Sequence, residues 1–321
     1  MKVLVTGANG FVGSAVVQEL LQNGHEVIGW VRSKEAAERL QASGATAIRG
    51  SITDTSRLQE VSQQVDTVIH TAFFHKFSQA GLPGQLRIML GGSPSNIGAR
   101  FMQTAVGAEQ RAIEAFGKGL SAQNGALIIA LPTMTLKPSV VGQEAHAGDP
   151  YSVGGGRVAS EQTLKKLADH GVRPSLVRLP PIVYGANDYT GLLPSLIKIT
   201  NAKSKAAYVA DGNNHWANVH RLDAAKLFVK VAEQTGKGST YHAVGHSGVP
   251  FREIAEQIAQ YSRQPLTSLQ TTESDKHFSW LSSFVQADNP VSSEWTRKTL
   301  DWQPQERSLA EEMEYGHYFE K

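Results

Sequence analysis

The chain reads Thr6-Gly7-Ala8-Asn9-Gly10-Phe11-Val12-Gly13 near its beginning, and this stretch decides the fold. It lies between an apolar run at residues 3–5 and an amphipathic run at residues 12–21, whose apolar positions have helical spacing. A second apolar run follows at residues 27–31. The glycines therefore occupy the turn of a predicted strand–turn–helix–strand unit, which is the setting of a dinucleotide-binding turn.

Glycine at these three positions has a physical reason. One glycine lets the chain turn sharply without a Cβ clash, another lets the backbone approach a pyrophosphate, and Gly13 lets the helix pack tightly on the strand. Backbone N–H groups at the helix start, with the positive end of the helix dipole, can then hold the phosphates. The predicted cofactor-binding residues of the turn are Gly7, Asn9, Gly10, Phe11, Val12 and Gly13.

The spacing of this turn resembles that of the extended and atypical short-chain dehydrogenase/reductases, also called the NAD-dependent epimerase/dehydratase family. The resemblance recurs at Arg178-Leu179-Pro180-Pro181-Ile182-Val183-Tyr184-Gly185, at residues 211–223 and at Leu300-Asp301-Trp302-Gln303-Pro304. It implies an α/β fold with a Rossmann-type doubly wound parallel sheet. The domains it implies are an NAD(P)-binding domain over residues 1–175 and a smaller, interleaved substrate domain over residues 176–321, from which some strands return to the Rossmann sheet.

Composition narrows the function classes. The 321 residues contain 31 Lys+Arg and 29 Asp+Glu, for a net charge of +2, so no nucleic-acid partner is expected. There is no cysteine and no histidine pair with metal-ligand spacing, so no metal site is predicted. No apolar stretch is long enough to span a bilayer, and the first strand begins too early to leave room for a signal peptide. We expect a cytoplasmic protein with a small-molecule substrate and no membrane contact; a homodimer is left open.

The end of the second strand bears on the choice of cofactor. An Asp or Glu there binds the ribose 2′-hydroxyl of NAD(H), but this chain has Arg32 followed by Ser33. A guanidinium can bind a 2′-phosphate through two hydrogen bonds. We therefore predict that NADP(H) is preferred over NAD(H).

Further cofactor contacts are expected along the same edge of the sheet, where doubly wound folds bind their ligands. The resemblance places Ser51 and Ile52 near the adenine and residues Pro180, Pro181, Ile182 and Val183 beside the nicotinamide amide. The exit of the fourth strand places Thr71, Ala72 and Phe73 at the nicotinamide half.

The catalytic helix departs from the family pattern. The resemblance implies a Tyr with a Lys four residues later, and the Lys is often followed by a small residue and a Glu at the offsets of Ser160 and Glu161. That register puts Val153 at the Tyr position and Arg157 at the Lys position. Arg157 is then expected to hold the ribose and supply positive charge, and Thr133 to donate a hydrogen bond to the substrate oxygen. The proton donor is open among Tyr151, His75 and water. Tyr151 is the first choice, because the glycines at residues 154–156 could let it swing in.

Residues 74–103 carry no clear periodicity and are broken by repeated glycine and proline. A long loop in a compact domain is usually a functional lid or a disordered insertion, and the two remain equal alternatives here. Taken together, the residues favour an NADPH-dependent reductase of a small aldehyde or ketone. The alternatives are a catalytically inactive NADP(H)-binding sensor or scaffold and, less favoured, a sugar epimerase or dehydratase.

Overall fold

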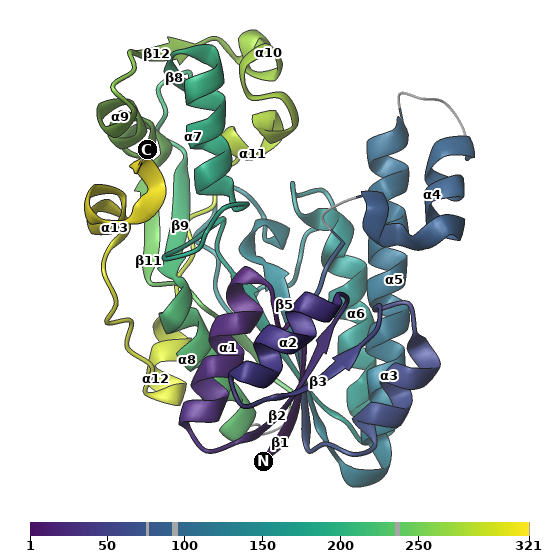
Figure 1. Cartoon of the computed structure of the whole chain (residues 1–321). Helices are drawn as coiled ribbons and strands as arrows, with labels where there is room; N and C mark the ends of the chain where they lie inside the picture. Colours follow the sequence, from purple (N-terminus) through teal and green to yellow (C-terminus); the bar gives the residue numbers. More distant parts are fainter. Residues whose placement is uncertain (75–76, 92–95, 235–237, 321) are drawn as a thin grey trace. The chain divides into compact units, whose positions relative to one another are not determined.

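The computed structural model describes residues 1–74, 77–91, 96–234 and 238–320 (Figure 1). Seven strands form one sheet in the order β10-β6-β5-β4-β1-β2-β3. They are β1 (Lys2–Thr6), β2 (Glu26–Val31), β3 (Thr46–Arg49), β4 (Thr67–His70), β5 (Ala126–Pro132), β6 (Arg173–Leu179) and β10 (Thr240–His242). The pairs from β5 to β3 are all parallel, so the predicted α/β Rossmann-type fold is confirmed.

The central strand β1 shows why these residues form a parallel sheet. Val3, Leu4 and Val5 are completely buried, as expected for a strand with helices on both faces. Its last residue, Thr6, pairs with Trp30 of β2 and with His70 of β4. The three strands therefore end together, and the turn after β1 begins at the edge where β4 leaves the sheet.

The helices of the Rossmann part lie on the two faces of the sheet (Figure 1). They are α1 (Phe11–Gln22), α2 (Lys34–Ala42), α3 (Thr55–Ser62), α5 (Ile97–Leu120) and α6 (Val158–Lys166). Helix α5 packs against both α3 and α6, while α1 and α2 pack on the strands β2 and β3. One apolar core, which includes Leu4, Ile113, Phe116 and Leu127, fills the space between the sheet and α5.

The chain divides into two compact units. The first comprises Met1–Leu131, Gly156–Val177 and Phe228–Ser239, and the second Pro132–Gly155, Arg178–Leu227 and Thr240–Lys321. The units differ from the domains predicted at residues 1–175 and 176–321 because 132–155 group with the second unit and 228–239 with the first. The predicted substrate-binding role of the second part stays a prediction.

The second unit has two small sheets of its own. One holds β7 (Ile182–Tyr184), β9 (His215–His220) and β11 (His246–Pro250), and the other holds β8 (Ala206–Val209) and β12 (Leu266–Leu269). The remaining helices are α7 (Leu192–Lys203), α8 (Arg221–Glu233), α9 (Phe251–Ser262), α10 (Ser274–Phe278), α11 (Ser282–Val285), α12 (Glu294–Leu300) and α13 (Leu309–Tyr315). Helix α8 contributes residues to both units. Among the described residues, no helix is long and apolar enough to cross a membrane.

The prediction that residues 74–103 form a loop is wrong for the residues that the structure describes. They form a 3₁₀ turn (Phe77–Ala80), the helix α4 (Gly81–Leu90) and the first turns of α5. A glycine costs about 1 kcal/mol in a helix, and packing can offset that cost. Ile88 is fully buried, and a Cβ at Gly84 would lie 3.0 Å from the Ala80 side chain. A lid role for this helical hairpin stays a prediction.

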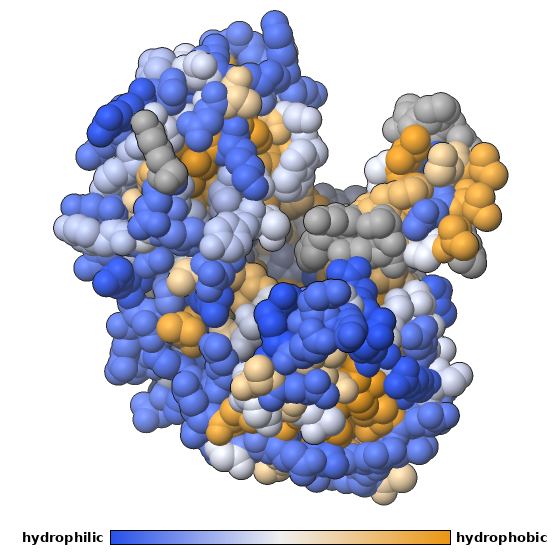
Figure 2. Space-filling view, in the orientation of Figure 1, coloured by the Kyte–Doolittle hydropathy of each residue, from blue (hydrophilic) through white to orange (hydrophobic). Residues whose placement is uncertain are grey.

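Helix α4 also has an exposed apolar face. Leu82, Leu86, Met89 and Leu90 are 57–78% exposed and lie one or two turns apart on one side of the helix. Figure 2 shows apolar side chains gathered over this helix. Soluble proteins rarely expose several large apolar side chains side by side, so this face of α4 is an unusual surface.

Candidate functional site

The turn after β1 is packed tightly against the exit of β4. Gly7 has a φ of 71°, and a Cβ there would lie 2.8 Å from the Thr71 hydroxyl oxygen. A Cβ at Gly13 would overlap the carbonyl oxygen of Gly7. The Gly10 N–H donates to that same carbonyl oxygen at 2.7 Å, and the Thr71 hydroxyl donates to the Thr6 carbonyl oxygen at 2.8 Å. Both glycines are therefore required by close approach of the backbone.

The start of helix α1 fits an anion. The helix begins at Phe11 after the N-cap Gly10, and its first turn contains no acidic residue. Asn9 and Gly10 are exposed and Phe11 and Val12 are half-buried, so this end of the helix faces solvent, although the Gly10 N–H is itself used by Gly7. Since helix N-termini favour phosphate, the residues at this turn fit the pyrophosphate of a dinucleotide.

The end of β2 carries an exposed guanidinium. Among the described residues, none forms a hydrogen bond or an ion pair with the Arg32 side chain. The Ser33 hydroxyl oxygen caps helix α2 and accepts from the Ala36 N–H at 3.1 Å. Arg32 is therefore available to a ligand, whereas Ser33 already serves as the cap of α2.

The predicted adenine contacts lie in a compact turn after β3. The Ser51 hydroxyl oxygen accepts from the Thr53 N–H at 3.3 Å and from the Thr53 hydroxyl at 3.0 Å. Ile52 is only 5% exposed and belongs to the apolar core. The Ile52 side chain therefore lies in the core rather than on an open surface, and a contact between either residue and the adenine stays a prediction.

Arg157 lies at the exit of β4. It is the N-cap residue of α6, and its guanidinium carbon is 4.2 Å from the centroid of the Phe73 ring. Thr71, Ala72 and Phe73 are half-buried, and Thr71 and Ala72 lie against Gly7. The first unit thus brings the glycine turn, the exit of β4 and Arg157, the residue predicted at the lysine position, to one edge of the sheet.

A buried carboxylate holds Arg157 in place. Glu109 of α5 is fully buried and accepts from the Arg157 Nε at 3.2 Å, from the Arg157 Nη2 and from the Ser160 hydroxyl at 2.6 Å. Arg157 Nη2 also donates to the Ala130 carbonyl oxygen at 3.0 Å. Sequence reasoning missed Glu109. Its signal was a single acidic residue on a helix face otherwise made of residues such as Ala105, Ala112 and Ile113.

The remaining donors of Arg157 define what this side chain can do. A guanidinium has five N–H donors, of which Nε and Nη2 are used by Glu109 and Ala130. In the described part of the chain, no acceptor binds the two N–H groups of Nη1, and the side chain is 15% exposed. The negative charge of Glu109 offsets the positive charge that Arg157 was predicted to supply to the site. Arg157 therefore offers a positioned pair of N–H donors.

His70 lies beside this network at the end of β4. Its Nδ1 is 2.6 Å from the Thr6 hydroxyl oxygen. Burial, and to a lesser extent the positive charge of Arg157, lowers the pKa of His70 to about 3. The imidazole is therefore neutral at physiological pH. Its contact with Thr6 joins the ends of β1 and β4.

Thr133, the predicted donor to the substrate oxygen, lies in the second unit and is fully buried. Its hydroxyl donates to Asn289 Oδ1 at 2.6 Å, and Asn289 Nδ2 donates back to the Thr133 carbonyl oxygen at 3.2 Å. The hydroxyl hydrogen is therefore already used by Asn289. This geometry does not favour the predicted donor role, which stays a prediction.

The candidate proton donors are not held in a site by the described residues. Tyr151 is 95% exposed, and His75 lies outside the described residues. The neighbouring glycines are explained by packing. The Gly154 N–H donates to the Met134 carbonyl oxygen at 2.9 Å, and a Cβ at Gly155 would overlap the Pro150 carbonyl. These glycines therefore form a tight turn, not the flexible hinge considered from the sequence.

We expect Tyr151→Phe to change turnover by less than about threefold, because a general acid contributes only when it is positioned at the reacting group. The measurement is steady-state reduction of whichever carbonyl compound the protein accepts. A loss of 10-fold or more, within reach of a general acid's contribution, would instead identify the Tyr151 phenol as the proton donor.

The predicted contacts at residues 180–183 lie in the second unit. Ile182 and Val183 belong to β7, and Pro180 and Ile182 are buried. Their contact with a nicotinamide stays a prediction. No group of three or more metal-ligating side chains occurs among the described residues.

Comparison with known proteins identifies the family. Residues 3–83 match the model of the NAD dependent epimerase/dehydratase family. Over 99% of its length the chain is 38% identical to the uncharacterized protein C2A9.02 of Schizosaccharomyces pombe, of which it covers 100%. The chain belongs to the NAD-dependent epimerase/dehydratase family. The resemblance stated from the sequence is therefore confirmed.

Two further proteins are similar at lower identity. The chain is 25% identical to the 4-hydroxy-2-methyl-3-oxo-4-farnesyl-3,4-dihydroquinoline-1-oxide ketoreductase of Stigmatella aurantiaca, over 79% of this chain and 71% of that protein. Among solved structures, MoeE5 in complex with UDP-glucose and NAD has a TM-score of 0.69 at 20% identity, covering 98% of this chain and 96% of that one. The structural likeness shows that the fold is shared.

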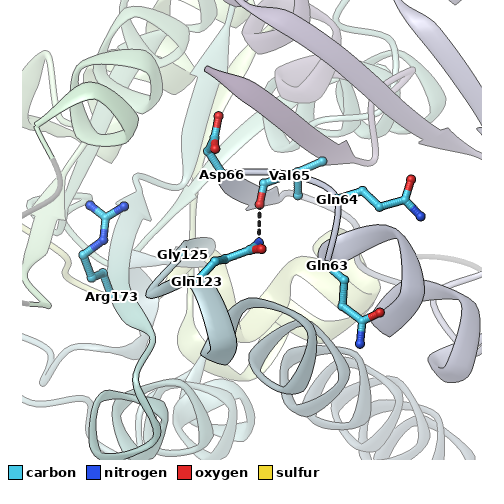
Figure 3. Close-up of a pocket in the computed structure, with 7 residues that line it drawn as sticks. All are labelled: Gln63, Gln64, Val65, Asp66, Gln123, Gly125 and Arg173. Carbon is cyan, nitrogen blue, oxygen red and sulfur yellow. Dashed lines mark hydrogen bonds between the residues drawn. The ribbon is translucent and has the colours of Figure 1, made fainter.

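A separate cavity of this epimerase/dehydratase-family chain lies at the opposite edge of the sheet, where β4, β5 and β6 begin (Figure 3). Its polar groups close the surrounding turns. The Gln123 amide donates to the Ser62 and Val65 carbonyl oxygens, and an Asp66 carboxylate oxygen accepts from the Lys2 N–H at 2.7 Å. Because doubly wound folds bind ligands at the carboxyl ends of their strands, this cavity is not the candidate site.

Proposed function

We propose that this protein is an NADPH-dependent reductase of a small aldehyde or ketone. The observation that carries the proposal is the Arg157 guanidinium on Phe73, whose two Nη1 N–H groups have no acceptor among the described residues. A guanidinium stays protonated and cannot act as a base. Reduction of a carbonyl needs donors toward the developing oxyanion, which is what such a group can supply. Epimerisation and dehydration lean on the Tyr-Lys pair that the sequence lacks.

The residues of the first unit would bind the cofactor and the reacting oxygen in the following way. The Gly7–Gly13 turn and the first turn of α1 bind the pyrophosphate, and Arg32 binds the 2′-phosphate. Bound NADPH supplies a hydride to the carbonyl carbon. Arg157 donates from Nη1 to an oxygen at the site, either a ribose hydroxyl or the carbonyl oxygen. As the carbonyl electrons move to oxygen, water delivers the proton that completes the alcohol.

Relatives are consistent with this proposal, since one distant relative is named a ketoreductase. A second function, an NADP(H) sensor without chemistry, is favoured by a specific observation. The Thr133 hydroxyl is bonded to Asn289, and Tyr151 is almost fully exposed, so neither predicted donor is held at a reacting group by the described residues. The two functions share cofactor binding and differ in turnover.

The test combines binding and turnover. By calorimetric titration, NADPH should bind at least about tenfold more tightly than NADH, and Arg32→Ala should remove most of that difference. NADPH oxidation should then be detected against a panel of aldehydes, ketones and imines. Equal binding of the two cofactors would contradict the NADPH preference. Tight NADPH binding with no turnover across the panel would contradict the reductase and support the sensor.

A further inference from the structure

A second arginine, Arg49, lies at the end of the strand next to the one that Arg32 follows. Strand β3 pairs with β2 in parallel, and Arg49, the last residue of β3, is the partner of Val31. Gly50 continues the contact, because its N–H donates to the Val31 carbonyl oxygen at 2.8 Å. Arg49 therefore lies across from the residue that immediately precedes Arg32.

The face of the sheet that carries Arg49 is the face that α2 covers. Side chains alternate along a strand, so Gly29 and Val31 share a face with their partners Ala47 and Arg49. A Cβ at Gly29 would overlap the Leu40 side chain of α2, which identifies this face. The Arg49 side chain therefore leaves the strand end on the side where α2 begins.

The charged side chains at the ends of β2 and β3 favour the binding of an anion. In the part of the chain that the structure describes, neither Arg32 nor Arg49 forms an ion pair or a side-chain hydrogen bond, and both are exposed. The opposing group is Glu35, whose pKa is lowered by its own backbone N–H, by the Ser33 hydroxyl and by the charges of Arg39 and Arg49. Glu35 is thus turned back onto the start of α2.

The end of β3 is also fixed in position. Arg57 of α3 donates from Nη1 to the Arg49 carbonyl oxygen at 2.8 Å, and its guanidinium carbon is 5.5 Å from the centroid of the Trp30 ring. The Trp30 ring in turn fills the space where a side chain at Gly50 would lie. The backbone that carries Arg49 is therefore held by two neighbouring elements.

We propose that Arg49 and Arg32 together form the binding site for the 2′-phosphate of the cofactor, with Arg49 as a specificity-determining residue. This inference rests on the proposed use of NADPH. Two guanidinium groups at adjacent strand ends can surround a phosphate dianion, and each can form paired hydrogen bonds with its oxygens. NADH has no such phosphate, so Arg49 contributes to its binding only weakly.

The test is calorimetric titration of the full chain with NADPH, NADH, adenosine 2′,5′-bisphosphate and AMP. Arg49→Ala should weaken binding of NADPH and of the bisphosphate about tenfold, the scale of one lost charge-assisted contact, and change NADH and AMP by less than about twofold. Glu35→Gln should tighten NADPH binding, because it removes the opposing carboxylate. Arg111→Ala, on the exposed face of α5, removes the same charge elsewhere and should change neither ligand pair.

The outcomes separate this inference from the proposed function. If the unmutated protein bound NADPH and NADH equally, the proposed cofactor choice would fail. If it preferred NADPH, and Arg32→Ala but not Arg49→Ala reduced that preference, only the role of Arg49 would be refuted. An equal loss with Arg111→Ala would show that net charge, not a phosphate site at Arg49, sets the affinity, and would also overturn the inference.

Discussion

Arg157→Met is expected to lower the free energy of unfolding by about 3–5 kcal/mol, the cost of breaking a buried ion pair, and to reduce turnover roughly 10²-fold, the scale of a lost transition-state donor. The stability loss arises because Glu109 is fully buried and would keep a carboxylate without its cation. The loss of turnover arises because the Nη1 donors disappear. Denaturant unfolding and steady-state reduction measure the two effects separately.

A second variant distinguishes the two causes. In Arg157→Met combined with Glu109→Gln, the neutral amide can still accept from Ser160, so most of the lost stability should return while turnover stays low. Arg252→Met provides the matched control, because it breaks an exposed ion pair with Glu256 on α9 and should leave turnover unchanged. Recovery of turnover in the double variant would show that Arg157 acts only through stability.

Gly13→Ala is expected to weaken cofactor binding by roughly 10²-fold, because a displacement on the order of 1 Å at a binding residue has effects of this size. The added Cβ would overlap the Gly7 carbonyl oxygen and lie 2.8 Å from the Thr71 hydroxyl oxygen. The Gly7 carbonyl belongs to backbone that is already hydrogen-bonded to Gly10, so helix α1 must move instead. Calorimetric titration with NADPH measures the change.

Gly98→Ala is the control for this substitution. A Cβ at Gly98 in helix α5 meets nothing within 4 Å, so the same chemical change should leave cofactor affinity unaltered. If Gly13→Ala also bound NADPH with unchanged affinity, the turn after β1 would not be the pyrophosphate site.

The Rossmann part was predictable because its signals are local. The apolar run at residues 3–5, the glycine turn and the amphipathic run after it lie within a few residues of one another. The bounds of β1 and α1 match the two predicted runs to within one or two residues. Helix α4 was missed because Gly81 and Gly84 read as loop residues. Its helical state depends on the burial of Ile88 and on contacts with α5. Neither of these tertiary contacts leaves a pattern in the local sequence.

The candidate site was predictable only where a motif fixes the position. Arg157 was identified from its place relative to Ser160 and Glu161. Glu109, its ion-pair partner, lies 48 residues earlier in a helix and has no motif of its own. The bond between Thr133 and Asn289 spans 156 residues, so no local pattern could show that the Thr133 hydroxyl is already used.

Glu109 also restricts how this chain can change during evolution or engineering. Introducing the usual pair through Val153→Tyr and Arg157→Lys would place the new lysine beside a buried carboxylate that accepts its charge-assisted hydrogen bonds. Such a lysine would be neutralised by Glu109 and would do little to lower a phenol's pKa. Restoring the ordinary relay therefore calls for a third substitution, at Glu109 in α5, so that the new lysine keeps its charge for the phenol.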